Sequence, residues 1–310
     1  MHRRDLERDS AMLSAGDWYA ITCGLVWSFA VILMRIAGFT IPPLPLTFFK
    51  SFVAVLGFIA VLLYQGGPWV PDYPAKVWAE LVLSAVFGIA IADTLFAAAL
   101  NRLGASLQAL ADCIYAPSIA LVGLLMFGEG LNTPELIGGA LVISGVFVGL
   151  VKTKEIENSK DLFYGVCFAA SAHVIMAVGI LVVRDVIKEG DLVWIAGFRF
   201  SVATLALALF LLIRQDWTSL TIGFRRSDLW KFTVPMAILG PFLATLLWIA
   251  GFKHETPGRV AIYNQLSTVF VILWAWLLLK EPMTKKKLAG VVLAVTGAII
   301  VGLADVSFFW

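Results

Sequence analysis

Apolar stretches of roughly 20 residues recur along almost the whole chain, and short polar segments separate them. A helix of that length crosses a hydrocarbon core of about 30 Å. The stretches are continuously apolar, whereas the strands of a membrane barrel would alternate at every second residue. The pattern therefore predicts an all-α integral membrane protein with ten spans. Their expected limits are about 17–39, 45–64, 78–98, 105–127, 134–151, 162–183, 192–213, 232–252, 258–279 and 286–303.

The polar segments between the expected spans are short. Only four residues, Asn101 to Gly104, separate the third span from the fourth. Connections of this length make consecutive helices antiparallel neighbours and leave no room for a soluble domain. The clearest linker is the polar segment 152–161, which divides the chain into two halves.

The two halves repeat one another. With a shift of 152 positions, 125–132 aligns with 277–284, and a shift of 149 aligns 49–54 with 198–203. Each half holds five spans, an odd number, so the repeats must be inserted in opposite orientations around a central cavity. Duplicated membrane halves are typical of secondary transporters. The expected five-helix repeats are 17–151 and 162–303.

The composition agrees with a membrane protein and argues against several kinds of partner. Sixty per cent of the 310 residues are hydrophobic and the mean hydropathy is +0.91. The net charge of +2, with its basic residues in loops, predicts no nucleic-acid partner. Cys23, Cys113 and Cys167 lie in apolar stretches, so no disulfide framework or zinc spacing is expected. The charged segment 1–16 lacks the apolar region of a cleaved signal peptide.

The distribution of basic residues bears on orientation. Ten spans place both termini on one side of the membrane. That side carries eight Lys and Arg residues and the other side twelve, when Arg35, Lys50 and Arg199 within the spans are left out. By the positive-inside rule these counts favour an external amino terminus.

Glu129 and Glu281 occupy equivalent positions of the two repeats, at the ends of spans four and nine. Coupling carboxylates of a transporter are one interpretation. A structural role is favoured, because a helix start follows each of them and a carboxylate beside a helix amino terminus is stabilised by the helix dipole.

Four cations lie inside or at the ends of spans. Lys50 and Arg199 are equivalent in the two repeats and lie about a turn and a half inside spans two and seven. They either extend toward the membrane interface along their own stems or form a cationic rim for a substrate carboxylate. Arg35 and Arg184 are expected to be interfacial anchors.

Several polar side chains lie deep inside apolar spans, where contact with lipid is costly, and are expected to face the bundle interior. Gln108, Asp112 and Tyr115 share one face of span four, and Asn264 is the counterpart of Asp112 on span nine. The alternative is a set of satisfied hydrogen bonds between helices. The residues expected to line one cavity are Trp27, Asp93, Asp112, Tyr115, His173, Trp248, Tyr263 and Asn264.

Other features concern the helices themselves. Pro117 and the pair Gly240-Pro241 are expected to interrupt spans four and eight, as kinked helices of transporters often do. Small residues spaced four apart in spans five and ten predict close helix packing, within the fold or between two protomers. Trp18, Trp78, Trp194 and Trp230 lie near span ends and are expected to form interfacial belts.

Six short motifs follow one another along the chain: Trp27, Phe49-Lys50, Leu103-Gly104-Ala105-Ser106, Phe127-Gly128-Glu129, Phe198-Arg199 and Leu279-Lys280-Glu281. Taken in this order, they resemble the EamA-type, ten-helix branch of the drug/metabolite transporter superfamily, over about residues 17 to 303. Within it the chain is most similar to bacterial aromatic amino-acid exporters. Span nine departs from the family pattern, because Thr256-Pro257-Gly258-Arg259 stands where an Ala-Ser run is more usual.

The resemblance implies a multi-pass protein of the bacterial inner membrane with both termini in the cytoplasm, opposite to the charge count. It implies a secondary transporter or facilitator that exports amino acids, aromatic or otherwise apolar, and related metabolites by alternating access. A drug or nucleotide-sugar transporter of the same fold is the runner-up; a channel or a lipid-modifying membrane enzyme is disfavoured. A small-molecule substrate and the lipid bilayer are the expected partners, with no cofactor and no metal, and a monomer or a homodimer is left open.

Overall fold

The structure is a computed structural model that describes residues 14–66, 70–128, 133–150, 159–254 and 266–304. This described part consists of helices joined by short connections and contains no strand. Within the described residues, seven helices are long and apolar enough to cross a membrane, and shorter apolar helices cover Leu136–Gly149 and Leu266–Leu278. The prediction of an all-helical membrane protein is confirmed.

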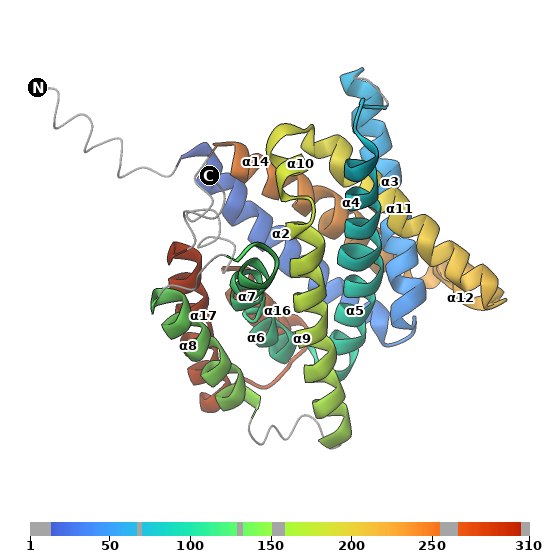
Figure 1. Cartoon of the computed structure of the whole chain (residues 1–310). Helices are drawn as coiled ribbons and strands as arrows, with labels where there is room; N and C mark the ends of the chain where they lie inside the picture. Colours follow the sequence, from blue (N-terminus) through green and yellow to red (C-terminus); the bar gives the residue numbers. More distant parts are fainter. Residues whose placement is uncertain (1–13, 67–69, 129–132, 151–158, 255–265, 305–310) are drawn as a thin grey trace, which may run out of the picture.

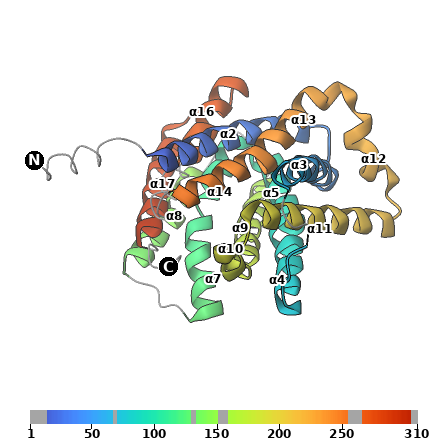
Figure 2. The same cartoon turned by 90° about the horizontal axis from the view of Figure 1, so that it is seen from above.

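Helices lie at every one of the ten expected spans (Figures 1 and 2). The helices of the first half are α2 (Ala15–Gly38), α3 (Pro43–Gln65), α4 (Ala75–Ala85), η1 (Val86–Ile91), α5 (Ala92–Leu103), α6 (Ala105–Asp112), α7 (Tyr115–Phe127) and α8 (Thr133–Leu150). Those of the second half are α9 (Ser159–Leu181), α10 (Arg184–Glu189), α11 (Leu192–Ile213), α12 (Trp217–Arg225), η2 (Ser227–Leu229), α13 (Trp230–Ala237), η3 (Ile238–Ala244), α14 (Thr245–His254), α16 (Leu266–Leu278) and α17 (Lys285–Ala304).

Local sequence signals fix where these helices begin and turn. Ser14 and Asp17 form a reciprocal capping box at the start of α2, and Pro43 suits the first turn of α3 because it needs no amide partner there. Between α5 and α6 the turn is made at Gly104, whose φ of +79° a side chain would resist. The third and fourth spans therefore follow each other with almost no loop.

Three spans change helical geometry near their middle. The third span passes through a π-helical segment, η1, and the eighth span through another, η3. The two segments begin at equivalent positions of the repeats, because a shift of 152 aligns Val86 with Ile238. Pro241 lies within η3 and has no amide hydrogen to donate. In the fourth span α6 ends at Asp112 and α7 begins at Tyr115, just before Pro117. These are the interruptions that the prolines predicted in spans four and eight.

The small-residue faces of spans five and ten pack against each other within the chain, and α8 and α17 lie side by side in Figures 1 and 2. A Cβ on Gly145 would lie only 2.6 Å from the backbone nitrogen of Ala294, and one on Gly290 only 2.6 Å from the oxygen of Gly145. The close packing expected from this spacing is therefore made inside one protomer.

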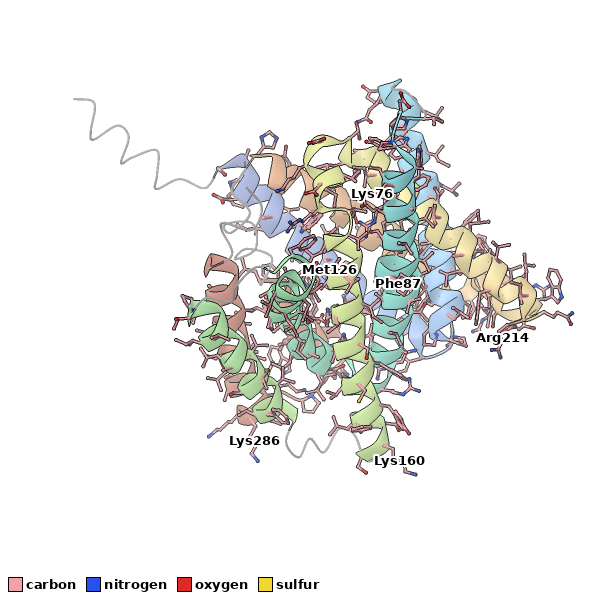
Figure 3. All side chains as sticks on the ribbon, viewed as in Figure 1. Lys76, Phe87, Met126, Lys160, Arg214 and Lys286 are labelled. Carbon is pink, nitrogen blue, oxygen red and sulfur yellow. The ribbon has the colours of Figure 1, made fainter. Side chains whose placement is uncertain are left out.

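The outer surface of the bundle suits a bilayer. Large apolar side chains such as Phe87 are exposed along its flanks, while Lys160 and Lys286 lie at the lower ends of α9 and α17 (Figure 3). Trp18 and Trp230 are exposed near span ends, as interfacial tryptophans are. Trp194 is different from the expected belt residue, because it is buried and stacks on Phe198.

Candidate functional site

A cavity of about 350 Å³ lies among helices of both halves of the chain. Spans one to four contribute α2, α3, η1, α5, α6 and α7, and the second half contributes α9, α11, η3, α14 and α16. Both π-helical segments form part of its wall, through Gly88 and Gly240. The lining side chains that can bond or stack include Trp27, Lys50, Asp93, Phe96, Asp112, Tyr115, His173, Arg199, Thr245, Trp248, Ser267 and Thr268.

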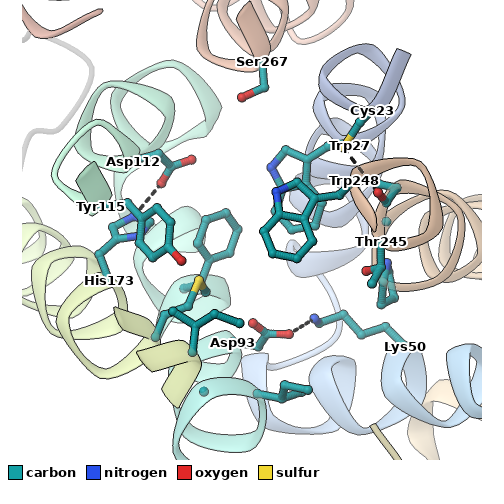
Figure 4. A pocket seen from close by; sticks show the side chains of 18 of the residues that line it. Cys23, Trp27, Lys50, Asp93, Asp112, Tyr115, His173, Thr245, Trp248 and Ser267 are labelled. Atoms are coloured by element: carbon teal, nitrogen blue, oxygen red, sulfur yellow. Dashed lines mark hydrogen bonds and ion pairs between the residues drawn. The ribbon is translucent and has the colours of Figure 1, made fainter. Parts of the chain in front are cut away.

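Six of the eight residues expected at one cavity line this one: Trp27, Asp93, Asp112, Tyr115, His173 and Trp248. They come from α2, α5, α6, α7, α9 and α14, and their convergence is visible in Figure 4. The other two, Tyr263 and Asn264, lie outside the described residues. Ser267 and Thr268, three and four residues after Asn264 on span nine, also line the cavity.

Other lining residues were not on that list. Phe96 lies one turn after Asp93 on α5, and the helical spacing of the two residues is the signal that could have found it. Thr245 is the counterpart of Asp93 at the 152-residue shift. Lys50 and Arg199 line the cavity too, which agrees with the cationic-rim interpretation of these residues.

Lys50 is paired at the cavity wall. Its side chain is 3% exposed, and its Nζ forms an ion pair and hydrogen bond with Asp93 Oδ2 (Figure 4). Thr47 donates its hydroxyl to the backbone oxygen of Asp93 at 3.5 Å. Lys50 therefore does not extend to the membrane interface. A buried ion pair survives because each charge compensates the other, at the cost of removing both from water.

One carboxylate oxygen of Asp112 contacts two polar side chains. Its Oδ1 accepts a hydrogen bond from Gln108 Nε2 at 2.8 Å and lies 2.9 Å from His173 Nε2. His173 Nδ1 is buried and has no hydrogen-bond partner in the described part of the chain. The second oxygen of Asp112 makes no hydrogen bond to a described residue, so it is available to a molecule in the cavity.

Aromatic rings surround this polar group. The ring of His173 lies 5.9 Å from that of Tyr115 and 6.3 Å from that of Phe96, and the Phe96 ring lies 6.0 Å from Trp27. In Figure 4, Trp27 and Trp248 face Tyr115 and His173 across the cavity. Such rings offer apolar faces to a flat or apolar ligand.

Glu281 caps a helix, as expected, but the helix is α6 of the first half rather than the helix that follows Glu281 in the sequence. Its carboxylate accepts hydrogen bonds from the amides of Ala105 and Ser106 at 2.8 and 2.9 Å, and from the Ser106 hydroxyl at 2.5 Å. It thus caps α6 of the first half. The helix that follows it, α17, is capped by Thr284, whose hydroxyl oxygen accepts from the Lys287 amide at 3.1 Å. Glu129 lies outside the described residues.

The two arginines at span ends are engaged by protein groups. Arg35 donates from Nη1 to the backbone oxygens of Leu100 and Asn101, at 3.1 and 2.6 Å, at the end of α5. The guanidinium of Arg184 lies 3.5 Å from the ring centroid of Phe127. Arg35 therefore ties spans one and three together, which a simple interfacial anchor would not do.

Most of the chain matches one known family. The EamA-like transporter family model matches residues 14–151 and 163–303. The chain belongs to the EamA-like transporter family. It is a multi-pass membrane transporter.

Individual relatives agree with the family. The chain is 23% identical over 284 residues to an uncharacterized transporter of Archaeoglobus fulgidus, covering 91% of this chain and 95% of that one. It is 24% identical over 229 residues to the uncharacterized transporter YvbV of Bacillus subtilis, covering 73% and 72%. A solved crystal structure with 20% identity superposes with a TM-score of 0.65 over 93% of this chain and 96% of that chain, which supports the fold alone.

Proposed function

We propose that this EamA-like transporter exports amino acids with aromatic or other apolar side chains, and related metabolites, by alternating access. The two halves, 17–151 and 162–303, would act as inverted repeats about the cavity. The proposed location is the bacterial inner membrane, with both termini in the cytoplasm. The observation that carries the proposal is one cavity that combines two cations, two carboxylates and several aromatic rings.

The balance of charge in the cavity favours a zwitterion. Lys50 and Arg199 supply two positive charges, and Asp93 and Asp112 supply two negative ones, so the fixed charge sums to zero when His173 is neutral. An amino acid is also neutral overall but carries a charge of each sign. A nucleotide sugar, with its phosphates, calls for an excess of cations. A cationic drug calls for an excess of carboxylates, whereas the two carboxylates of this cavity are balanced by two cations.

The size and lining of the cavity point the same way. Its volume of about 350 Å³ lies at the small end of the range of about 300–1,000 Å³ for small-molecule pockets. Stacking on rings such as Trp27 and Trp248 is worth roughly 0.5–1.5 kcal/mol per pair. Several weak contacts of this kind suit an exporter, which must release its cargo on the far side.

Transport into proteoliposomes tests the proposal. Purified full-length protein would be reconstituted and offered radiolabelled phenylalanine, leucine and a nucleotide sugar, with and without a pH gradient. Protein-dependent movement of the amino acids is expected, and the effect of the gradient separates uniport from proton antiport. Asp112→Asn should slow transport, whereas Leu205→Ala, on the exposed face of α11, should not. Movement of the nucleotide sugar alone would contradict amino-acid export.

A further inference from the structure

Arg199 is the cation of the cavity wall that lacks a direct partner among the described residues. Its Nε is buried without a hydrogen-bond partner, and no hydrogen bond or ion pair joins Arg199 to any described residue. The guanidinium passes beside the π-helical segment η1, where a Cβ on Gly88 would lie 3.2 Å from Nη2. A glycine at this place leaves the room that the guanidinium occupies.

Comparison of the two halves shows what Arg199 is missing. Its counterpart in the first half, Lys50, is neutralised by Asp93 on the neighbouring span. A shift of 152 residues puts Thr245, not a carboxylate, in the place of Asp93. Both Thr245 and Arg199 line the cavity. The second half thus keeps the cation and replaces its anion with a neutral hydroxyl.

Nearby groups compensate Arg199 only in part. Tyr115 and Asp93 line the same cavity and lie near Arg199. Asp93 already forms a hydrogen bond with Lys50, and Tyr115 carries no charge near neutral pH. Arg199 is partly exposed to the cavity, and a cation at membrane depth is stabilised by an anion beside it. The geometry therefore leaves a place for an anion from outside the protein.

We propose that Arg199 is a specificity-determining residue that binds the carboxylate of the substrate. A guanidinium can hold a carboxylate through two parallel hydrogen bonds, which also fixes the orientation of the bound molecule. The free oxygen of Asp112 then receives the substrate's ammonium group. The inference rests on the proposed function in taking an amino acid as the cargo, but the carboxylate site itself requires only an acid.

Three small probes separate the two charged sites: phenylalanine has a carboxylate and an ammonium group, 3-phenylpropionate has only the carboxylate, and phenethylamine has only the ammonium group. Binding to purified full-length protein in detergent would be followed by calorimetry. Arg199→Gln should weaken phenylalanine and 3-phenylpropionate about 10- to 100-fold, as expected for loss of a charged hydrogen bond, and leave phenethylamine within about twofold. Arg199→Lys should restore part of the loss, because it keeps the charge but not the planar fork.

Arg214→Gln is the matched control, because Arg214 is exposed at the end of the same helix and should change no probe. Thermal unfolding of each variant shows that it is folded. If Arg199→Gln weakens the binding of all three probes equally, or changes the binding of none of them, the proposed role of Arg199 is overturned. Arg199-dependent binding of 3-phenylpropionate without transport of any amino acid would leave the carboxylate site standing and remove amino-acid export. If the protein transports phenylalanine but Arg199→Gln binds the three probes as the unchanged protein does, amino-acid export stands and the carboxylate site at Arg199 is removed.

Discussion

Glu281, between α16 and α17, binds Ser106 at the start of α6 through both the amide and the hydroxyl, although 175 positions separate the two residues. The carboxylate fills the place where the helix leaves amide hydrogens without partners and where the dipole favours a negative charge. One turn of the second half therefore holds the first turn of a span of the first half.

Replacing Glu281 with Gln should destabilise the protein by about 1–2 kcal/mol, because an amide offers one acceptor oxygen where the carboxylate uses two. Transport per folded molecule should be nearly unchanged. The midpoint of thermal unfolding and proteoliposome transport measure the two effects, with Lys286→Gln on the exposed side of the same region as control. Abolished transport in a normally stable Glu281→Gln protein would show coupling rather than capping.

Removing one charge of the Lys50–Asp93 pair should destabilise the protein more than removing both. Asp93→Asn leaves a buried ammonium without its counter-charge, which costs about 3–5 kcal/mol. The double variant Lys50→Met with Asp93→Asn should recover a large part of that loss. Unfolding of the four proteins of this double-mutant cycle is the measurement. Additive effects of the two single changes would mean that the pair contributes no coupling.

Replacing each of two glycines of α8 with alanine should affect stability differently, because only one of them lies at the contact with α17. Gly145→Ala places a methyl group within 2.6 Å of the backbone of α17 and should cost about 1–3 kcal/mol. Gly139→Ala meets only Pro117 Cβ at 3.7 Å, so it should be neutral or slightly stabilising. Thermal unfolding compares the two variants, and equal midpoints would contradict the tight packing of this face.

Asp112 should behave as the opposite of Arg199 toward the three probes. Asp112→Asn removes the negative charge facing the cavity, and it should weaken phenylalanine and phenethylamine about 10-fold or more while sparing 3-phenylpropionate. Calorimetry on the same preparations supplies the values. Uniform weakening of all three probes would instead mean that the bonds of Asp112 to Gln108 and His173 only hold the cavity in shape.

Thiol accessibility tests the path of the substrate, with phenylalanine as the substrate offered. In a background in which Cys23, Cys113 and Cys167 are replaced, a thiol at Trp27 or His173 should react with a small aqueous reagent, and saturating substrate should slow the reaction. A thiol at Leu205, whose side chain is 59% exposed on the outer face of α11, should react slowly and show no protection. Similar behaviour of all three positions would place the path elsewhere.

Much of this architecture follows from local sequence. Continuous apolar stretches of bilayer length form helices because an unpaired backbone amide in lipid is costly, so the helices lie where the hydropathy pattern puts them. Pro117 and Pro241 mark the interruptions of spans four and eight, because proline cannot donate a helix hydrogen bond. The depth of Asp93, Asp112 and His173 in their spans indicated that they face inward.

Which residues and helix faces contact one another was decided by the tertiary structure alone. The sequence placed Glu281 beside a helix start but not beside α6, and it left Lys50 with a choice between the interface and the cavity. It also left open whether the small faces of α8 and α17 meet each other or a second protomer. The reason is that lipid and protein interior are almost equally apolar, so a membrane helix carries little pattern to tell one flank from another. Which polar group meets which is fixed only when the helices pack.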